Sequence, residues 1–396
     1  MRWNLMIGIV AFSLVFPACK EDNKMTRPEI TVKTVTVPEG TDQQQTAELM
    51  VSLSQPATED IMLIYSTQDN TAVEGQDYVA VNMGSTMINA GSATGTISLT
   101  IIPDDLLEFT EEFLVVLQEP DNALLVFSSI PVKIEDDDDF TPGRDADGYV
   151  TPASYPGLDL VWADEFDGPS INGEYWNFEL GDGCPNLCGW GNNELQQYSD
   201  VENNVKIENG KLIVTAIKKE GYDEYTSARI ITKGKKEFTF GRIDIRARLP
   251  FGRGIWPAIW MLGSNIDQVG WPVCGEIDIM ELVGHEPSVT HGTAHYDVNG
   301  WQSKGTSYYL SGNETFADEF HIFSILWEKN NIKWYVDYNP FFELSVESVG
   351  STYPFNSSFF FILNVAVGGN WPGDPDETTV FPQTMEVDYI RVFQQE

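Results

Sequence analysis

The sequence predicts an all-β protein of two units, an immunoglobulin-like sandwich followed by a larger β-jelly-roll sandwich. Its 396 residues exceed the length of one average domain. Aromatic residues make up 12% of the chain, and aromatic side chains favour strands. Short β-rich runs alternate with turn residues along most of the chain, and no run with the period of a helix competes with them.

The N-terminal segment, MRWNLMIGIVAFSLVFPACKEDN, has a basic Arg2, an apolar run and a small residue before Cys19. It resembles a bacterial lipoprotein signal, which implies that residues 1–19 are a signal peptide with Cys19 as the lipidated residue. The charged residues after Cys19 resemble a surface-export signal of Gram-negative lipoproteins. We therefore expect an exported outer-membrane or cell-surface lipoprotein. Because Phe16-Pro17 departs from the usual lipobox, an ordinary secretory signal is the alternative.

The charge of the chain argues against two classes of partner. Lys and Arg total 23 against 60 Asp and Glu, which gives a formal net charge of −37. Such a chain repels phosphate backbones and anionic lipid headgroups. We expect no nucleic-acid partner, and contact with a membrane only through the N-terminal lipid anchor.

Residues 28–139 contain the first set of predicted strands, spaced as in a sandwich. The stretches TAVEGQDYVA, IIPDDLLEFTEEFLVVL and IEDDDD resemble the Calx-beta domain, a calcium-associated immunoglobulin-like sandwich. Calcium prefers oxygen ligands, and the candidate ligands are Glu39, Asp77, Asp104, Asp105 and Asp136 to Asp139. The alternative is that these acids form the solvated end of a plain spacer.

Residues 140–157 interrupt the strand pattern with charge, Gly and Pro, and are predicted to form a linker. The second unit, residues 158–396, consists again of strand candidates, among them KLIVTAI, GRIDIRARL, GEIDIMEL and FFFILNVAVGG. A jelly roll of two antiparallel sheets fits this pattern.

Export implies an oxidising compartment in which cysteines can pair. Cys184 and Cys188 lie close together in GDGCPNLCGWG, and a disulfide between them is the preferred interpretation. A zinc site is the alternative, although no other Cys and no nearby His supplies further ligands. Cys274 is left over, and its thiol is expected to be an inert filler.

The run GEIDIMEL, residues 275–282, places three carboxylates on a strand that otherwise reads as buried. Glu276 and Asp278 share one face, about 6.6 Å apart along the backbone, and the isoleucines face the core. Strict alternation would bury Glu281 among the isoleucines without a partner, which is costly. We therefore predict a β-bulge, most simply at Met280, that returns Glu281 to the face of the other acids.

Carboxylates placed together raise the pKa of one of them while another stays ionised. A retaining glycosidase uses such a pair as acid and nucleophile, about 5–5.5 Å apart on either side of the scissile bond. The alternatives for this strand are a solvated acidic face and a row of calcium ligands.

Residues around the acidic strand favour the glycosidase. Trp256 and Trp260 in GIWPAIWML offer flat surfaces that suit the apolar faces of sugar rings. Further candidates for contact with a sugar, spread over other segments, are Asp244, Arg246, the WGNNELQ loop, His295, Asn364 and Trp371.

Seven motifs resemble, in order, the laminarinase-like endo-β-1,3-glucanases of glycoside hydrolase family 16: WGNNELQ, FGRIDIRARLP, GIWPAIWML, GEIDIME, HGTAHY, GGNWPG and VDYIRV. The resemblance implies that Glu276 is the nucleophile and that Glu281 is the general acid and then the base. Asp278 would assist Glu276 by hydrogen bonding and by modulating its charge.

The same resemblance implies roles for residues outside the acidic strand. The implied substrate-binding residues are Asn192, Arg246, Trp256, Trp260, His295, Asn364 and Trp371. A structural calcium that joins the first and last strands would be held by Glu165, Asp388 and the carbonyl of Gly210. Ordinary surface roles for Glu165 and Asp388 are the alternative.

These observations predict a retaining endo-β-1,3-glucanase that cleaves β-glucan polysaccharide by double displacement and needs no cofactor for catalysis. Two alternatives stay open. One is a hydrolase of mixed-linkage glucan or of an algal galactan, and the other is a non-catalytic surface glycan-binding protein.

Overall fold

The computed structural model describes residues 27–104, 110–137, 143–155, 157–221 and 224–395. Cys19 and the predicted signal peptide lie outside these ranges, so the lipid anchor stays a prediction. The chain separates into two compact units, one within residues 1–134 and the other formed mainly by residues 135–396. The described residues are nearly all strand, which confirms the predicted fold class.

Helices are few in the described part of the chain. They are two single-turn α-helices and one 3-10 turn: α1 (Ile266–Val269), α2 (Val346–Val349) and η1 (Cys188–Gly191). No helix there has the length and apolar character needed to cross a membrane.

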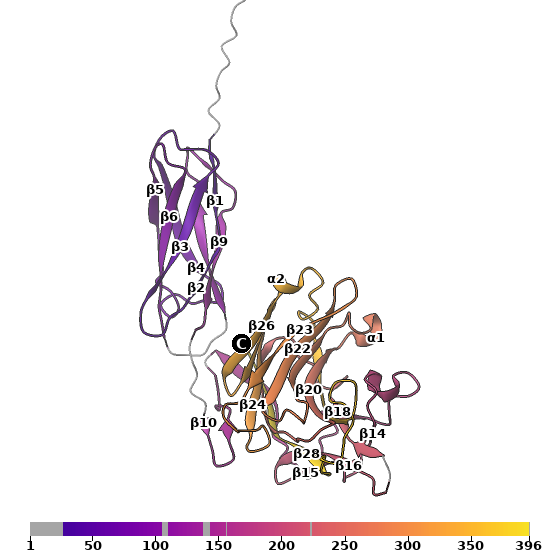
Figure 1. Ribbon diagram of the computed structural model, residues 1–396. Coiled ribbons are helices and arrows are strands. Elements are labelled where there is room, and N and C mark those ends of the chain that lie inside the picture. Colours follow the sequence, from indigo (N-terminus) through magenta and orange to yellow (C-terminus); the bar gives the residue numbers. More distant parts are fainter. Residues whose placement is uncertain (1–26, 105–109, 138–142, 156, 222–223, 396) are drawn as a thin grey trace, which may run out of the picture. The chain divides into compact units, whose positions relative to one another are not determined.

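The first unit is a sandwich of two sheets (Figure 1). One sheet consists, in order, of β6 (Thr94–Ile101), β3 (Gln45–Leu53), β1 (Glu29–Val32) and β8 (Leu124–Leu125). The other consists of β2 (Val35–Pro38), β9 (Ser129–Glu135), β7 (Glu111–Gln118), β4 (Ile61–Asp69) and β5 (Gly84–Ile88). Alternate residues of β3, namely Ala47, Leu49 and Val51, are fully buried between the sheets, as a two-residue period predicts.

The second unit packs two larger sheets against each other in the way a jelly roll does (Figure 1). The seven-stranded sheet consists, in order, of β13 (Asn177–Glu179), β18 (Arg229–Ile231), β27 (Phe359–Val367), β20 (Ile255–Gly263), β21 (Glu276–Glu281), β22 (Val289–Asp297) and β23 (Trp301–Tyr309).

The ten-stranded sheet faces it across the core. Its main path is β14 (Gln196–Tyr198), β17 (Tyr225–Ser227), β16 (Lys211–Lys218), β28 (Gln383–Gln395), β19 (Gly241–Arg248), β24 (His321–Glu328), β25 (Asn331–Val336) and β26 (Asn339–Ser345). Two further strands, β12 (Leu158–Asp164) and β15 (Val205–Glu208), pair with β28 and β16.

The core between these sheets is apolar and contiguous. Ile243 and Ile245 of β19 and Ile277 of β21 belong to one cluster of fully buried side chains. All nine residues of β27 are buried, because this strand lies between β18 and β20 near the middle of its sheet. The core packs against the inward side of β20 and β21, and the outward side of β21 carries the predicted acids.

The segment predicted to be a linker is partly structured. β10 (Gly143–Arg144) pairs with β11 (Tyr149–Val150), and Tyr155 is buried with its hydroxyl on Asp244. The linker prediction over residues 140–157 is therefore wrong for this part. This polar stretch has no periodic apolar residues that would predict structure. Tyr155 is buried only through contacts with strands that are distant in the sequence.

Candidate active site

A β-bulge in β21 brings its three acids to one face. Pairing with both neighbouring strands skips a residue between Asp278 and Glu281. Ile279 is the residue without a partner on β20, and it is buried in the core together with Met280. The predicted bulge is therefore present, with Ile279 as the extra residue instead of Met280. We call the outward side of this sheet, which carries the acids, the catalytic face.

The opposite sheet holds the bulge from the core side. Trp334 of β25 is fully buried, and its Nε1 donates a hydrogen bond to the main-chain carbonyl of Asp278 at 2.9 Å. Because a bulge disrupts the strand ladder locally, a buried carbonyl there benefits from a donor outside the ladder. Trp334 thus ties the backbone at Asp278 to the ten-stranded sheet.

Two indole groups donate to the outer acids. Nε1 of Trp271, in the loop before β21, donates to Oε2 of Glu276 at 2.8 Å. Nε1 of Trp256, on β20, donates to Oε1 of Glu281 at 3.1 Å. A donor favours the ionised form of a carboxyl group, and the donor on Glu276 is the closer one.

Burial dominates the electrostatics of the acids. It raises the pKa of Glu276 from its ordinary 4.5 to about 8, helped by the charge of Asp278. Burial, then the charges of Asp278 and Glu276, raises the pKa of Glu281 far above its ordinary value. Burial therefore favours the protonated form of both groups. A protonated Glu281 is what a general acid requires, and the closer indole donor on Glu276 favours the ionised form that a nucleophile requires.

His295 of β22 lies beside the first two acids. Its Nε2 is 3.1 Å from Oδ2 of Asp278 and 3.9 Å from Oε1 of Glu276. Within the described ranges, these three residues form the one group whose donor atoms lie close enough together, within 4.8 Å, to hold a metal ion. The group coincides with the predicted catalytic acids.

Most of the predicted substrate-binding residues gather around β21. Trp256 contacts the ring of Trp371 edge to face, with centroids 5.6 Å apart. Trp260 donates from Nε1 to Oδ1 of Asn364 at 2.8 Å. The carbonyl of Asn192 accepts a hydrogen bond from the amide of residue 370, next to Trp371. Together with His295, these residues supply aromatic and polar groups near the acids.

Arg246 and Asp244 are the exceptions, and their predictions as contacts to a sugar are wrong. Asp244 lies on β19 of the ten-stranded sheet, where it is fully buried and pairs with Arg242. Arg246 belongs to β19 of the ten-stranded sheet. Its two neighbours along the strand, Ile245 and Ala247, face the core. The guanidinium of Arg246 points away from the seven-stranded sheet and pairs with Asp145 at 2.7 Å and Asp388 at 2.6 Å. Its side chain is almost completely buried by these partners.

The structure adds residues that the sequence analysis missed. Arg229 of β18 lies over the rings of Trp190, at 4.5 Å, and Trp260, at 4.9 Å. His291 of β22 contacts the ring of Trp371 at 4.9 Å. Strand alternation in HGTAHY, which puts positions 291 and 295 on one face, could have identified His291. No local pattern identifies Arg229.

The cysteines are arranged as the preferred interpretation predicts. Cys184 and Cys188 form a disulfide with a Cα–Cα distance of 4.2 Å. Cys274 is a buried free thiol, and burial raises its pKa to about 11. A thiol of this kind stays protonated and unreactive at neutral pH.

The predicted calcium ligands lie on the ten-stranded sheet. β12 pairs with β28 up to Asp164↔Ile390, and β16 pairs with it from Leu212↔Val387, so the two strands meet beside Asp388. Glu165 directly follows β12, and Gly210 directly precedes β16. Glu165 also forms a two-pronged ion pair with Arg391, at 2.8 and 2.9 Å.

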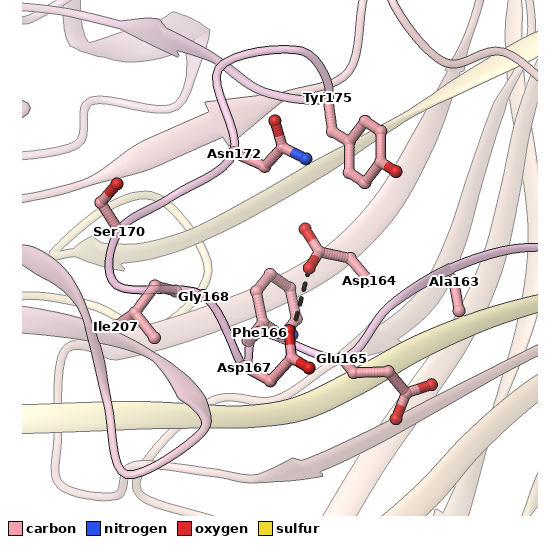
Figure 2. Close-up of a pocket in the computed structure, with 10 residues that line it drawn as sticks. All are labelled: Ala163, Asp164, Glu165, Phe166, Asp167, Gly168, Ser170, Asn172, Tyr175 and Ile207. Atoms are coloured by element: carbon pink, nitrogen blue, oxygen red, sulfur yellow. Dashed lines mark hydrogen bonds between the residues drawn. The ribbon is translucent and has the colours of Figure 1, made fainter.

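A cavity of about 230 Å³ lies at the C-terminal end of β12 (Figure 2). Its acidic wall includes Asp164, which accepts hydrogen bonds from Nε1 of Trp176 and from the amide of Phe166. Its lining residues are Ala163, Asp164, Glu165, Phe166, Asp167, Gly168, Ser170, Asn172, Tyr175 and Ile207. None of them belongs to the catalytic face, so the cavity is separate from the acids of β21.

An acid pair on one face of a bulged strand, bordered by tryptophans, has the residue types that a glycoside hydrolase site uses. The chain belongs to the glycosyl hydrolases family 16, whose sequence model matches residues 192–391. The Calx-beta domain model matches residues 21–138. Both predicted families are confirmed, and so is the predicted class of enzyme.

Individual relatives agree with the family. Beta-glucanase of Rhodothermus marinus is 40% identical over 257 residues, which cover 60% of this chain and 86% of the relative. Glucan endo-1,3-beta-glucosidase A1 of Niallia circulans is 38% identical over 273 residues, 63% of this chain but only 40% of the relative's length. The laminarinase catalytic domain of Thermotoga maritima superposes with a TM-score of 0.57 and 49% identity, covering 60% of this chain and 99% of that one.

The raised pKa of Glu276 predicts a pH-dependent stability cost. Between pH 4.5 and about 8 the unfolded chain ionises this carboxyl group while the folded chain keeps its proton, so folding loses stability as pH rises. Glu276→Gln removes the cost. We expect the melting temperature of the variant to exceed that of the wild type by an amount that grows over this range. Each 1 kcal/mol of difference in the free energy of unfolding corresponds to about 2–4 °C.

Calorimetric scans at several pH values measure this difference. Glu377→Gln, a change at an exposed acid, is the matched control. A difference between Glu276→Gln and the wild type that stays constant from pH 4.5 to 8 would contradict the buried, proton-retaining carboxyl group.

Proposed function

We propose that this chain is a retaining endo-β-1,3-glucanase that hydrolyses laminarin-type polysaccharide by double displacement. The observation that carries the proposal is the position of Glu276 and Glu281 on one face of bulged β21, with an indole donor on each of them. The β-1,3 linkage is supported by relatives that are named as laminarinase or as glucan endo-1,3-beta-glucosidase.

In the first step Glu281 donates its proton to the glycosidic oxygen while Glu276, in the fraction of molecules in which it is ionised, attacks the anomeric carbon through a carboxylate oxygen. The bond between that carbon and the leaving oxygen breaks, and an ester joins the sugar to Glu276. The leaving chain departs with the proton as a free hydroxyl group. Trp256 then donates to the carboxylate that remains on Glu281, which stabilises its new charge.

In the second step the ionised Glu281 takes a proton from water, and the oxygen of that water attacks the anomeric carbon. The ester bond to Glu276 breaks, and its electron pair returns to the carboxylate, which the indole of Trp271 stabilises. Glu281 is protonated again and ready for the next cycle. Two inversions at one carbon retain its configuration.

Asp278 contributes through its charge and not through a bond to the sugar. It lies between the two acids on β21, and burial raises its own pKa to about 8. Where Asp278 is ionised, its charge disfavours a second and a third negative charge nearby. The charge therefore keeps the proton on Glu281 until the leaving oxygen receives it. When Glu276 is esterified it has no charge, and Glu281 can ionise more easily.

Variants at the two acids test these roles. On laminarin we expect Glu281→Gln and Glu276→Gln each to lose at least about 1,000-fold in kcat, since each removes a group that takes part in bond making or breaking. On an aryl glycoside, whose leaving group needs no protonation, Glu281→Gln should recover most of the first step. Glu276→Gln is the control, because it lacks the nucleophile and should stay inactive on both substrates.

Reducing-end assays on laminarin, barley mixed-linkage glucan and agarose measure the substrate class alongside these variants. Faster cleavage of laminarin, into internal fragments of retained configuration, is the expected result. Preference for agarose, or equal loss by Glu281→Gln on both kinds of substrate, would contradict the proposal.

We also propose a structural calcium ion at Glu165, Asp388 and the carbonyl of Gly210. The register of β12 and β16 supports it, since these three oxygen donors flank one point of β28, and calcium prefers such ligands. Calcium at 100 times its dissociation constant should stabilise the fold by about 2.7 kcal/mol. Melting scans with calcium and with chelator measure this, and a gain of the same size in Glu165→Gln would refute the site.

Export with lipid attachment at Cys19 is a further proposal, supported by the basic, apolar and small residues that precede this cysteine. In a bacterial host the chain should partition into the membrane fraction and incorporate labelled fatty acid. Cys19→Ala should remove the label. Labelling that persists in this variant would place the lipid elsewhere.

A further inference from the structure

An exposed tryptophan on the neighbouring strand contacts the histidine that lies beside the acids. Trp301 is the first residue of β23 and is 55% exposed. Its Nε1 donates a hydrogen bond to Nδ1 of His295 at 3.0 Å. The two ring planes are 10° apart and their centroids are 5.9 Å apart, a separation that suits an in-plane hydrogen bond between ring edges.

This hydrogen bond determines where the imidazole carries its proton. In the neutral ring one nitrogen has a hydrogen and the other has a lone pair. Because Nδ1 accepts from the indole of Trp301, the hydrogen of His295 must reside on Nε2. The partner of one ring nitrogen thus selects the tautomer that the other presents.

The selected tautomer meets a need at Asp278. Oδ2 of Asp278 is buried and has no well-aligned hydrogen bond in the described structure. The Nε2 atom of His295 lies 3.1 Å away from it, so a small rotation of the ring completes the bond. The other tautomer would place a lone pair against Oδ2, which leaves this buried oxygen without a donor and is costly.

A second indole, that of Trp271, lies beside the rings of Trp301 and His295. The ring of Trp271 lies 6.1 Å from the ring of Trp301 and 6.3 Å from that of His295. Trp271 donates to Glu276 directly, whereas Trp301 acts one step away, through His295. Both donors come from partly exposed aromatic residues, not from lysine or arginine side chains.

We propose that Trp301 is a positioning residue, which holds His295 in the Nε2–H tautomer and thereby keeps a hydrogen-bond donor on Asp278. The effect of Trp301 on turnover rests on the proposed glucanase function, because the charge of Asp278 influences both Glu276 and Glu281 in the double displacement. The tautomer itself is a property of the folded chain and can be measured without substrate.

The first experiment reads the tautomer directly. The chain has four histidines, so long-range ¹H–¹⁵N spectra of ¹⁵N-histidine-labelled protein resolve each ring, and His295→Gln assigns the signal. Across the pH range where the ring is neutral, we expect an unprotonated Nδ1 and a protonated Nε2. In Trp301→Phe, which keeps an aromatic ring but removes the donor, the signal should change to a mixture of tautomers.

Tyr309→Phe is the matched control. Tyr309 is the last residue of the same strand and is 69% exposed, and the change also removes one polar donor from an exposed aromatic ring. The His295 signal should be the same in this variant as in the wild type.

The second experiment measures turnover of laminarin. Loss of one hydrogen bond to the buried carboxyl group of Asp278 predicts that Trp301→Phe lowers kcat about five- to tenfold, with KM changed less than about twofold. A wild-type ring with its proton on Nδ1, a ring that stays doubly protonated, or an unchanged tautomer in Trp301→Phe would each overturn the proposal. So would a rise in KM alone, which would make Trp301 a sugar-stacking surface. Lack of turnover in the wild type would refute the glucanase and leave the tautomer result standing.

Discussion

The rest of the active site depends on the bulge in β21. A regular strand would direct Glu281 into the core with Ile277, and one extra residue turns it to the side of Glu276. Apolar packing buries both residues of the kink, and Trp334 of the opposite sheet holds the backbone at Asp278. The position of the acids is therefore set by the core on the other side of the strand, where no substrate reaches.

Three neighbouring carboxyl groups are a liability for folding, and the structure offsets it with neutral donors. Trp256 and Trp271 come from β20 and a loop, and they donate to Glu281 and Glu276. Neutral N–H groups stabilise a carboxylate less than a cation does. They therefore leave the proton of Glu281 in place, which catalysis by a general acid requires. A lysine or arginine in contact with Glu281 would favour its ionised form.

Much of this arrangement could be predicted from local sequence. The two-residue period of strands, combined with the cost of burying a lone carboxyl group, was enough to predict the bulge to within one residue. The prediction failed at Arg246, because alternation tells which side of its own strand a residue occupies but not which sheet the strand joins. β19 joined the ten-stranded sheet, so the outward side of Arg246 is the side away from the acids.

The sequence by itself determined the all-β class, the two families, the acids of β21 and the pairing of Cys184 with Cys188, since each depends on residues a few positions apart. The tertiary structure alone decided the donors: Trp334 on the backbone of Asp278, Trp271 on Glu276 and Trp301 on His295. It also buried Tyr155 of the predicted linker. Trp334 reaches Asp278 from 56 residues away, across the core. The other two pairs are only five and six residues apart, but they meet because of how the loop before β21 and the β22–β23 hairpin fold, which strand alternation does not predict. The pairing of β22 with β23 and the packing of β25 beneath β21 are properties of the whole chain.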